Sequence, residues 1–252
     1  MKAKRHILVA NWKMNPLTIA EARSLWRTSV KYTSEADKVT TIICPPSVYL
    51  GRFPSQKSKR IGLGIQDVSS ERSGAHTGMI SALMAIDAGA THSLVGHSEC
   101  RKRGDTDEIV NKKMHTALDV GLTAIVCIGE DVRNDNGTHL SFLRDQIENT
   151  FKGLSKKHIG HVIIAYEPVW AIGAPTAMEA HDVHEMSLFI RKTISELFKG
   201  IGLHSLPILY GGAVTTENAG DIVNIGHVDG LLVGRQSLEK DSLKQIIEIL
   251  NS

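Results

Sequence analysis

Short apolar runs alternate with longer stretches of helical periodicity along this chain. In stretch 19–32, for example, apolar residues recur every three or four positions, as they do on one face of a helix. The apolar runs predict strands over 7–12, 41–44, 62–66, 93–96, 123–128, 162–167, 207–210 and 230–233. The periodic stretches predict helices over 19–32, 79–88, 108–119, 140–154, 182–198, 217–223 and 242–250.

This alternation is typical of βαβ units around a parallel sheet. Roughly eight strands in about 250 residues match an α/β fold of the closed (β/α)8 TIM barrel type. An open doubly wound sheet is the alternative, but no Gly-x-Gly-x-x-Gly motif opens the first helix, which counts against a dinucleotide site. Because no linker, low-complexity tract or change in composition interrupts the 252 residues, we expect one barrel domain over 1–252.

Charge and cysteine content narrow the function classes. The 29 Lys and Arg residues nearly balance 27 Asp and Glu residues, so the net charge of +2 gives no reason to expect nucleic acid or an anionic membrane as a partner. Cys44, Cys100 and Cys127 are odd in number and lack Cys-x-x-Cys spacing, which favours a reducing compartment. No apolar run is long enough for a signal peptide or a membrane span, so we expect a soluble cytoplasmic protein.

Unusual polar residues collect where the predicted strands end. Asn11 and Lys13 close the first strand, His97 and Glu99 follow the fourth, and Glu167 ends the sixth. In a β/α barrel these ends form one face, which holds the active site. We therefore expect an acid–base set in which Lys13, His97 and Glu167 converge. Taken singly, each has a structural alternative; Glu99, for example, could pair with Arg101.

Glycines crowd the ends of the last two strands, at Gly211-Gly212 and Gly234. Glycine lets backbone N–H groups approach an anion closely, and barrel folds often bind phosphate at this place. Tight turns are the alternative explanation. A phosphate site opposite a general base predicts proton chemistry on a phosphorylated small molecule.

The order of residues in the segment 165–173 suggests a general base followed by a hinged flap. A buried strand delivers Glu167, and Pro168 keeps that residue out of the helical region. Trp170 follows, and Gly173 can act as a pivot. A carboxylate on a rigid strand end, followed by an apolar flap with a glycine hinge, suits a base that must be sealed from water.

These motifs together resemble the triosephosphate isomerase family. The resemblance covers nearly the whole chain, and it is carried by Asn11-Trp12-Lys13-Met14-Asn15, Gly96-His97-Ser98-Glu99, Val126-Cys127-Ile128-Gly129-Glu130, 165–173 and Tyr210-Gly211-Gly212. It implies interconversion of dihydroxyacetone phosphate and glyceraldehyde 3-phosphate, a step of glycolysis and gluconeogenesis, with no cofactor and no metal. It also implies a homodimer.

The resemblance also implies roles for particular residues. Glu167 is the base, His97 the electrophile and Lys13 the positive charge beside the substrate. The implied substrate-binding residues are Asn11, Lys13, Gly173, Ala213, Gly234 and Arg235, and the implied supporting residues are Ser98, Glu99, Thr77 and Cys127. Thr77 would support the partner's Lys13 region, although it could also cap a helix beginning at Met79.

The sequence departs from the family pattern in three places. The flap 171–177 is one residue shorter and contains Pro175, which predicts a stiffer hinge. In the phosphate loops Ala213 replaces a serine, and Arg235 replaces a glycine, where we expect it to offer only its backbone N–H. After His97, Cys100 replaces an arginine and Asp105 a glutamate, which bears on stability rather than reaction type.

Two other functions remain open at this point. The altered flap keeps alive an isomerase of a larger ketose, such as a tetrulose phosphate. A non-catalytic phosphosugar-binding barrel is disfavoured, because a pure binder needs no general base. His181 and His184 have the spacing of a metal pair, but no third ligand accompanies them, so we expect a solvated helix face.

Overall fold

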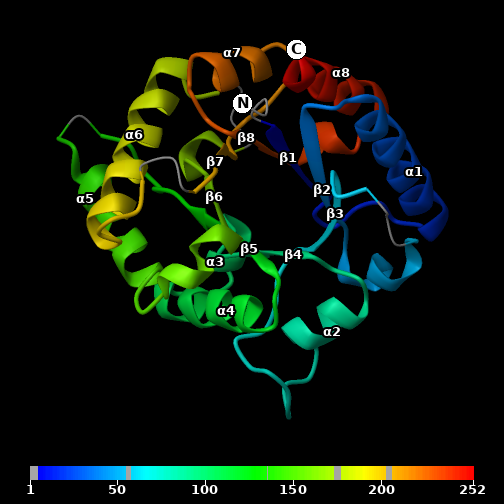
Figure 1. The fold of residues 1–252 in the computed structure, drawn as a ribbon, viewed down its shortest axis with the longest axis horizontal. Coiled ribbons are helices and arrows are strands. Elements are labelled where there is room, and N and C mark those ends of the chain that lie inside the picture. Colours follow the sequence, from blue (N-terminus) through cyan, green and yellow to red (C-terminus); the bar gives the residue numbers. More distant parts are fainter. Residues whose placement is uncertain (1–4, 55–57, 135, 173–176, 203–205) are drawn as a thin grey trace.

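The computed structural model of the chain describes residues 5–54, 58–134, 136–172, 177–202 and 206–252. Within these residues, eight parallel strands pair in sequence order and close into a barrel surrounded by helices (Figure 1). The last strand pairs with the first, which excludes an open sheet. The predicted (β/α)8 barrel is confirmed.

The strands are β1 (His6–Asn11), β2 (Val39–Cys44), β3 (Ile61–Ile65), β4 (His92–Val95), β5 (Thr123–Ile128), β6 (Val162–Tyr166), β7 (Ile208–Tyr210) and β8 (Gly230–Val233). The α-helices are α1 (Ile19–Glu35), α2 (Ala82–Asp87), α3 (Ser98–Arg101), α4 (Asp107–Asp119), α5 (Thr138–Thr150), α6 (Ala180–Leu197), α7 (Ala219–Asn224) and α8 (Lys240–Asn251). Short 3-10 helices are η1 (Ser47–Arg52), η2 (Lys156–His161), η3 (Val169–Ala171) and η4 (Arg235–Ser237).

The apolar core has two layers, because successive side chains of a strand point to opposite faces. In β5, Ile125 and Cys127 belong to the cluster inside the barrel, whereas Val126 and Ile128 belong to the larger cluster between strands and helices. Both faces of each strand are therefore covered, which explains why the strands read as nearly continuous apolar runs. The carboxyl ends of all eight strands meet at one end of this packed cylinder.

Two helices differ from the prediction for local reasons. The helix predicted over 79–88 begins only at Ala82, because the Ser81 hydroxyl accepts a hydrogen bond from the Met84 N–H and caps it. The alternative role of Thr77, a cap on a helix beginning at Met79, is therefore wrong. The helix predicted over 140–154 ends at Thr150, and Gly153 then adopts a left-handed conformation with φ +74°. No helix in the described ranges combines the length and apolarity that a bilayer span requires.

His92 is a titratable side chain at the amino-terminal end of β4, away from the strand ends that carry the site. Its ring lies against Gly62, where an added Cβ would come within 3.0 Å of two ring atoms, and it hydrogen-bonds the Thr91 hydroxyl. Burial disfavours the charged imidazole and lowers the pKa of His92 from 6.5 to about 4.

We expect this histidine to make the fold acid-sensitive. Between pH 6.5 and about 4, His92 is protonated in the unfolded state but mostly neutral in the folded state. The free energy of unfolding therefore falls as the pH falls through this range. The free energy of unfolding, measured with urea, should fall less between pH 7.5 and pH 4.5 in His92→Gln than in the wild type, by up to about 3 kcal/mol. The exposed His181, changed to Gln, is the matched control; an equal effect there would contradict the assignment.

Candidate active site

A cavity of about 340 Å³ opens at the carboxyl ends of the strands. Asn11 ends β1 and Lys13 follows it, His97 follows β4 and Glu167 follows β6, and all four line this cavity. The backbone turns after β7 and β8 close its other side with Gly211, Gly212, Ala213, Gly234 and Arg235. The structure therefore brings together residues that are far apart in sequence, while Gly173 and the flap residues 174–176 lie outside the described residues.

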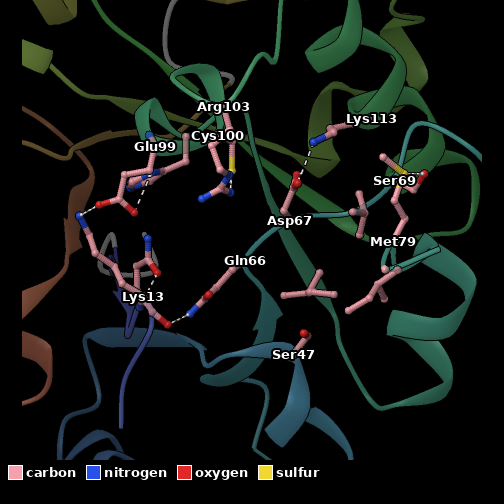
Figure 2. Close-up of a pocket in the computed structure, with 16 residues that line it drawn as sticks. Lys13, Ser47, Gln66, Asp67, Ser69, Met79, Glu99, Cys100, Arg103 and Lys113 are labelled. Carbon is pink, nitrogen blue, oxygen red and sulfur yellow. Dashed lines mark hydrogen bonds and ion pairs between the residues drawn. The ribbon is translucent and has the colours of Figure 1, made fainter. Parts of the chain in front are cut away.

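Lys13 is held in place from several directions. Its backbone has φ +53°, a left-handed conformation that is uncommon for a residue with a side chain, and its N–H donates to the Asn11 Oδ1 at 3.0 Å. Its Nζ lies 2.7 Å from the Glu99 Oε1, and its carbonyl accepts from the Gln66 Nε2 (Figure 2). A Cβ on Gly234 would lie 3.2 Å from the Lys13 Cε, so the glycine makes room for the lysine stem.

Glu99 balances the lysine electrostatically. Partial burial by itself would raise the pKa of this carboxyl, but the hydrogen bond and charge of Lys13, with a smaller contribution from Arg103, hold its pKa below the usual value. The alternative pairing with Arg101 does not occur, since Arg101 binds Asp107 at 2.6 Å. Lys13 and Glu99 therefore form an ion pair that orients the ammonium group toward the cavity.

His97 caps the short helix α3. Its Nδ1 accepts a hydrogen bond from the Glu99 backbone N–H at 3.1 Å, and its side chain is almost fully buried. Because a backbone N–H can only donate, Nδ1 carries no proton, and the neutral ring has its N–H at Nε2. That atom lies 3.3 Å from the Glu167 Oε1, so the imidazole presents a donor to the cavity.

Glu167 is a buried carboxylate, with only 2% of the residue exposed. Its Oε2 accepts from the Ser98 N–H at 3.2 Å, and its own N–H donates to the Ile128 carbonyl at 2.7 Å. Two glycines make this position possible, since a Cβ on Gly211 would lie 2.8 Å from the Glu167 Cγ and one on Gly129 would lie 1.8 Å from its carbonyl oxygen. The absence of side chains at these two glycines therefore gives the Glu167 residue the space it occupies.

Cys127 lies inside the barrel close to this carboxylate. Burial and the charge of Glu167 raise the pKa of the Cys127 thiol well above 9, so it stays protonated and acts as an inert neighbour. Ser98 acts through its backbone, whereas Thr77 lies on an exposed loop and is not among the residues that line the cavity.

Sequence reasoning missed the hydrogen bonds of two residues that shape the site, Glu130 and Gln66. The Glu130 Oε1 accepts from the Tyr166 hydroxyl and from the Trp170 Nε1, both at 2.9 Å, which ties the start of the flap segment to β5 and β6. Gln66 binds the carbonyls of Lys13 and Cys44. The signal for both was a polar residue within two positions of the end of an apolar strand, close to the signal that marked Glu167.

A second cavity of about 300 Å³ adjoins the first on the side of Lys13 (Figure 2). There the Lys113 Nζ lies 2.7 Å from oxygens of both Asp67 and Asp105. Asp67, Cys100 and Asp105 place their ligand atoms within 4.8 Å of one another, as metal ligands do. The buried ammonium group of Lys113 already supplies the positive charge, and burial raises the pKa of the Cys100 thiol to about 11, so this cluster reads as structural.

His181 and His184 stand in the first two turns of α6 and line neither of the two cavities. His181 is exposed, and the ring of His184 packs against His227 with centroids 4.6 Å apart. Within the described ranges, the one group of three or more side chains that could hold a metal includes neither histidine.

The sequence model of the triosephosphate isomerase family matches residues 6–250. The chain belongs to the triosephosphate isomerase family.

Individual triosephosphate isomerases match this chain over nearly their whole length. That of Francisella philomiragia subsp. philomiragia is 37% identical over 249 residues, covering 97% of each chain. That of Dictyoglomus thermophilum is 35% identical over 249 residues, covering 97% of this chain and 99% of the relative. The crystal structure of the Bartonella henselae enzyme superimposes with a TM-score of 0.87 at 32% identity, covering 98% of this chain and all of that one.

The glycine slot around Glu167 can be tested in an isomerase assay. Gly211→Ala places a methyl group 2.8 Å from the Glu167 Cγ and should lower kcat by about 10- to 100-fold, because the carboxylate must shift. Gly160→Ala is the control, since an added Cβ there meets no atom within 4 Å. Normal kcat in a folded Gly211→Ala protein would show that the slot does not position the base.

Proposed function

We propose that this chain interconverts dihydroxyacetone phosphate and D-glyceraldehyde 3-phosphate through an enediolate, with Glu167, His97 and Lys13 as the catalytic residues. One observation supports this assignment above the others: the buried Glu167 carboxylate lies 3.3 Å from the His97 Nε2 in a cavity that Lys13 also lines. A base, a neutral donor and a cation around one small cavity suit proton transfer next to a carbonyl.

In the proposed reaction Glu167 removes the proton from one substrate carbon, and the C–H electron pair forms the carbon–carbon double bond. The carbonyl π electrons move to oxygen, where the His97 Nε2–H, Lys13 and Asn11 stabilise the negative charge. His97 shuttles a proton between the two oxygens, and Glu167 returns its proton to the neighbouring carbon. Atoms and electrons balance within substrate and side chains, so the step requires no cofactor.

The substrate phosphate belongs, in this proposal, at the turns after β7 and β8. Ala213, Gly234 and Arg235 offer backbone N–H groups to the same cavity, and Lys13 supplies the charge. Gly173 would contribute from the flap. Arg235 is exposed, and we assign to it only its backbone donor.

Supporting roles follow from the contacts. Glu99 orients Lys13, Ser98 holds the Glu167 carboxylate through its N–H, and Cys127 fills the space beside it. We place the enzyme in glycolysis and gluconeogenesis in the cytoplasm. A reducing compartment of this kind keeps Cys44, Cys100 and Cys127 as free thiols, the state that they have in the structure.

Turnover measurements test the function and the base together. The wild-type chain should convert glyceraldehyde 3-phosphate in a coupled assay, and Glu167→Gln should lower kcat by about 10²- to 10⁴-fold, because the amide cannot accept the proton. KM should change little. A tetrulose phosphate run alongside should be converted far more slowly; faster conversion, or phosphate-ligand binding without turnover, would overturn the proposal.

We also propose a homodimer. Between β3 and α2 the chain extends away from the barrel (Figure 1), and residues 71–79 on this loop are exposed. Exposed apolar side chains stand on this loop, on α2 and in the segments after β1 and β2: Met14, Leu17, Val48, Met79, Leu83 and Met84. Apolar surface of this extent is typical of a protein–protein interface. Thr77 on the loop would then reach the neighbour's cavity beside Lys13.

Sedimentation at micromolar concentration should give twice the chain mass. Met79→Glu with Met84→Glu should dissociate the dimer and lower activity, because two buried carboxylates would oppose association. Phe142→Glu with Leu188→Glu is the matched control, as these side chains are similarly exposed on α5 and α6. A monomeric wild type, or equal dissociation by the control, would contradict the dimer.

A further inference from the structure

A groove of about 440 Å³ lies on the outside of the barrel, between α1 and residues 52–54, which continue from the end of η1. Figure 1 shows α1 beside the light-blue segment that follows β2. Trp26 and Val30 of α1 form one apolar wall, and Phe53 with Pro54 forms the other. This groove is separate from the two cavities at the strand ends, since it shares none of their lining residues.

The rim of the groove is entirely cationic. Its remaining lining residues are Arg23, Arg27, Lys31 and Arg52, and all four are exposed. In the part of the chain that the structure describes, none of them has an ion pair or a side-chain hydrogen bond. The acidic residues of α1, Glu21 and Glu35, stand near its ends and do not line the groove. Within the described residues, the positive charge of these four side chains is therefore not balanced by a neighbouring carboxylate.

The apolar walls are rigid. Phe53 stacks on Trp26 with centroids 4.6 Å apart and ring planes at 13°, and it meets Trp12 edge-on at 6.0 Å. Because one face of Phe53 is covered by Trp26 and Trp26 itself is buried, the groove offers aliphatic and edge contacts rather than a free aromatic face. It accommodates an apolar side chain and gives a nucleotide base little surface for stacking.

The cations follow the helix repeat. Arg23, Arg27 and Lys31 are spaced four residues apart and so rise by about 6 Å per step along α1. Trp26 and Val30 repeat with the same spacing on the adjoining stripe. The complementary surface is an amphipathic helix with carboxylates every four residues beside a stripe of leucine-like side chains.

We propose that this groove binds an acidic amphipathic peptide segment of another protein, with an apolar side chain between α1 and Phe53 and carboxylates on Arg23, Arg27, Lys31 and Arg52. Charge complementarity supports this occupant. The chain as a whole carries a net charge of only +2, so the four rim cations form a patch on an otherwise nearly balanced chain. Such a patch suits recognition of a short acidic segment, whereas broad nucleic-acid binding needs a more extended basic surface.

The test uses the whole protein and a fluorescein-labelled helical peptide of about 16 residues, with Glu at every fourth position and Leu on the adjoining stripe. Fluorescence anisotropy should show saturable micromolar binding that weakens with added salt. A peptide with Gln in place of Glu should bind at least about tenfold more weakly, since the charge contacts are lost.

Charge-reversal variants locate the site. Arg23→Glu with Arg27→Glu should weaken binding at least about tenfold while isomerase activity without peptide stays unchanged, which also reports correct folding. Lys152→Glu with Lys157→Glu makes the same change in net charge at exposed positions outside the groove and should leave affinity unchanged.

Equal affinity in all three proteins, or no saturable peptide binding, would refute the proposal. Tighter binding of a single-stranded oligonucleotide or of anionic lipid vesicles to the same groove would refute the peptide as its occupant.

Discussion

Closure of the barrel between β1 and β8 is the constraint on which the other features depend. Ile7 pairs with Gly230, where a Cβ would lie 1.9 Å from the Ile7 carbonyl oxygen, so the two backbones approach closely because this residue is glycine. Asp229 reinforces the junction, since its carbonyl accepts from the Ile7 N–H and its carboxylate accepts from Arg191 and from the Ile208 N–H. Only a closed cylinder brings the ends of β1, β4 and β6 around one cavity.

The site then depends on backbone as much as on side chains. Among the described residues, no Lys or Arg side chain pairs with the buried Glu167. The Ser98 N–H and the His97 ring hold it instead, in a slot lined by Gly129 and Gly211. Lys13, by contrast, carries its own counter-ion in Glu99. Glu167 and Lys13 thus line one cavity from the ends of different strands, each held by its own set of contacts.

Much of this arrangement follows from patterns in the sequence. The predicted strands 123–128 and 230–233 coincide with β5 and β8, because a buried parallel strand needs apolar residues on both faces and ends where polar residues begin. The helix α3 could not be predicted, since it has four residues and its cap is the side chain of His97. The contact of Glu130 with Trp170 depends on how β5 and β6 lie in space, which residue spacing does not contain.

The short stretch from His97 to Glu99 serves two groups at once. Its backbone N–H at Glu99 holds the imidazole, and its carboxylate holds the lysine ammonium. The imidazole and the counter-ion of Lys13 therefore depend on the same three residues, although the lysine itself stands on the segment after β1. A substitution that displaces this stretch would disturb the His97 ring and the Lys13 ion pair at the same time.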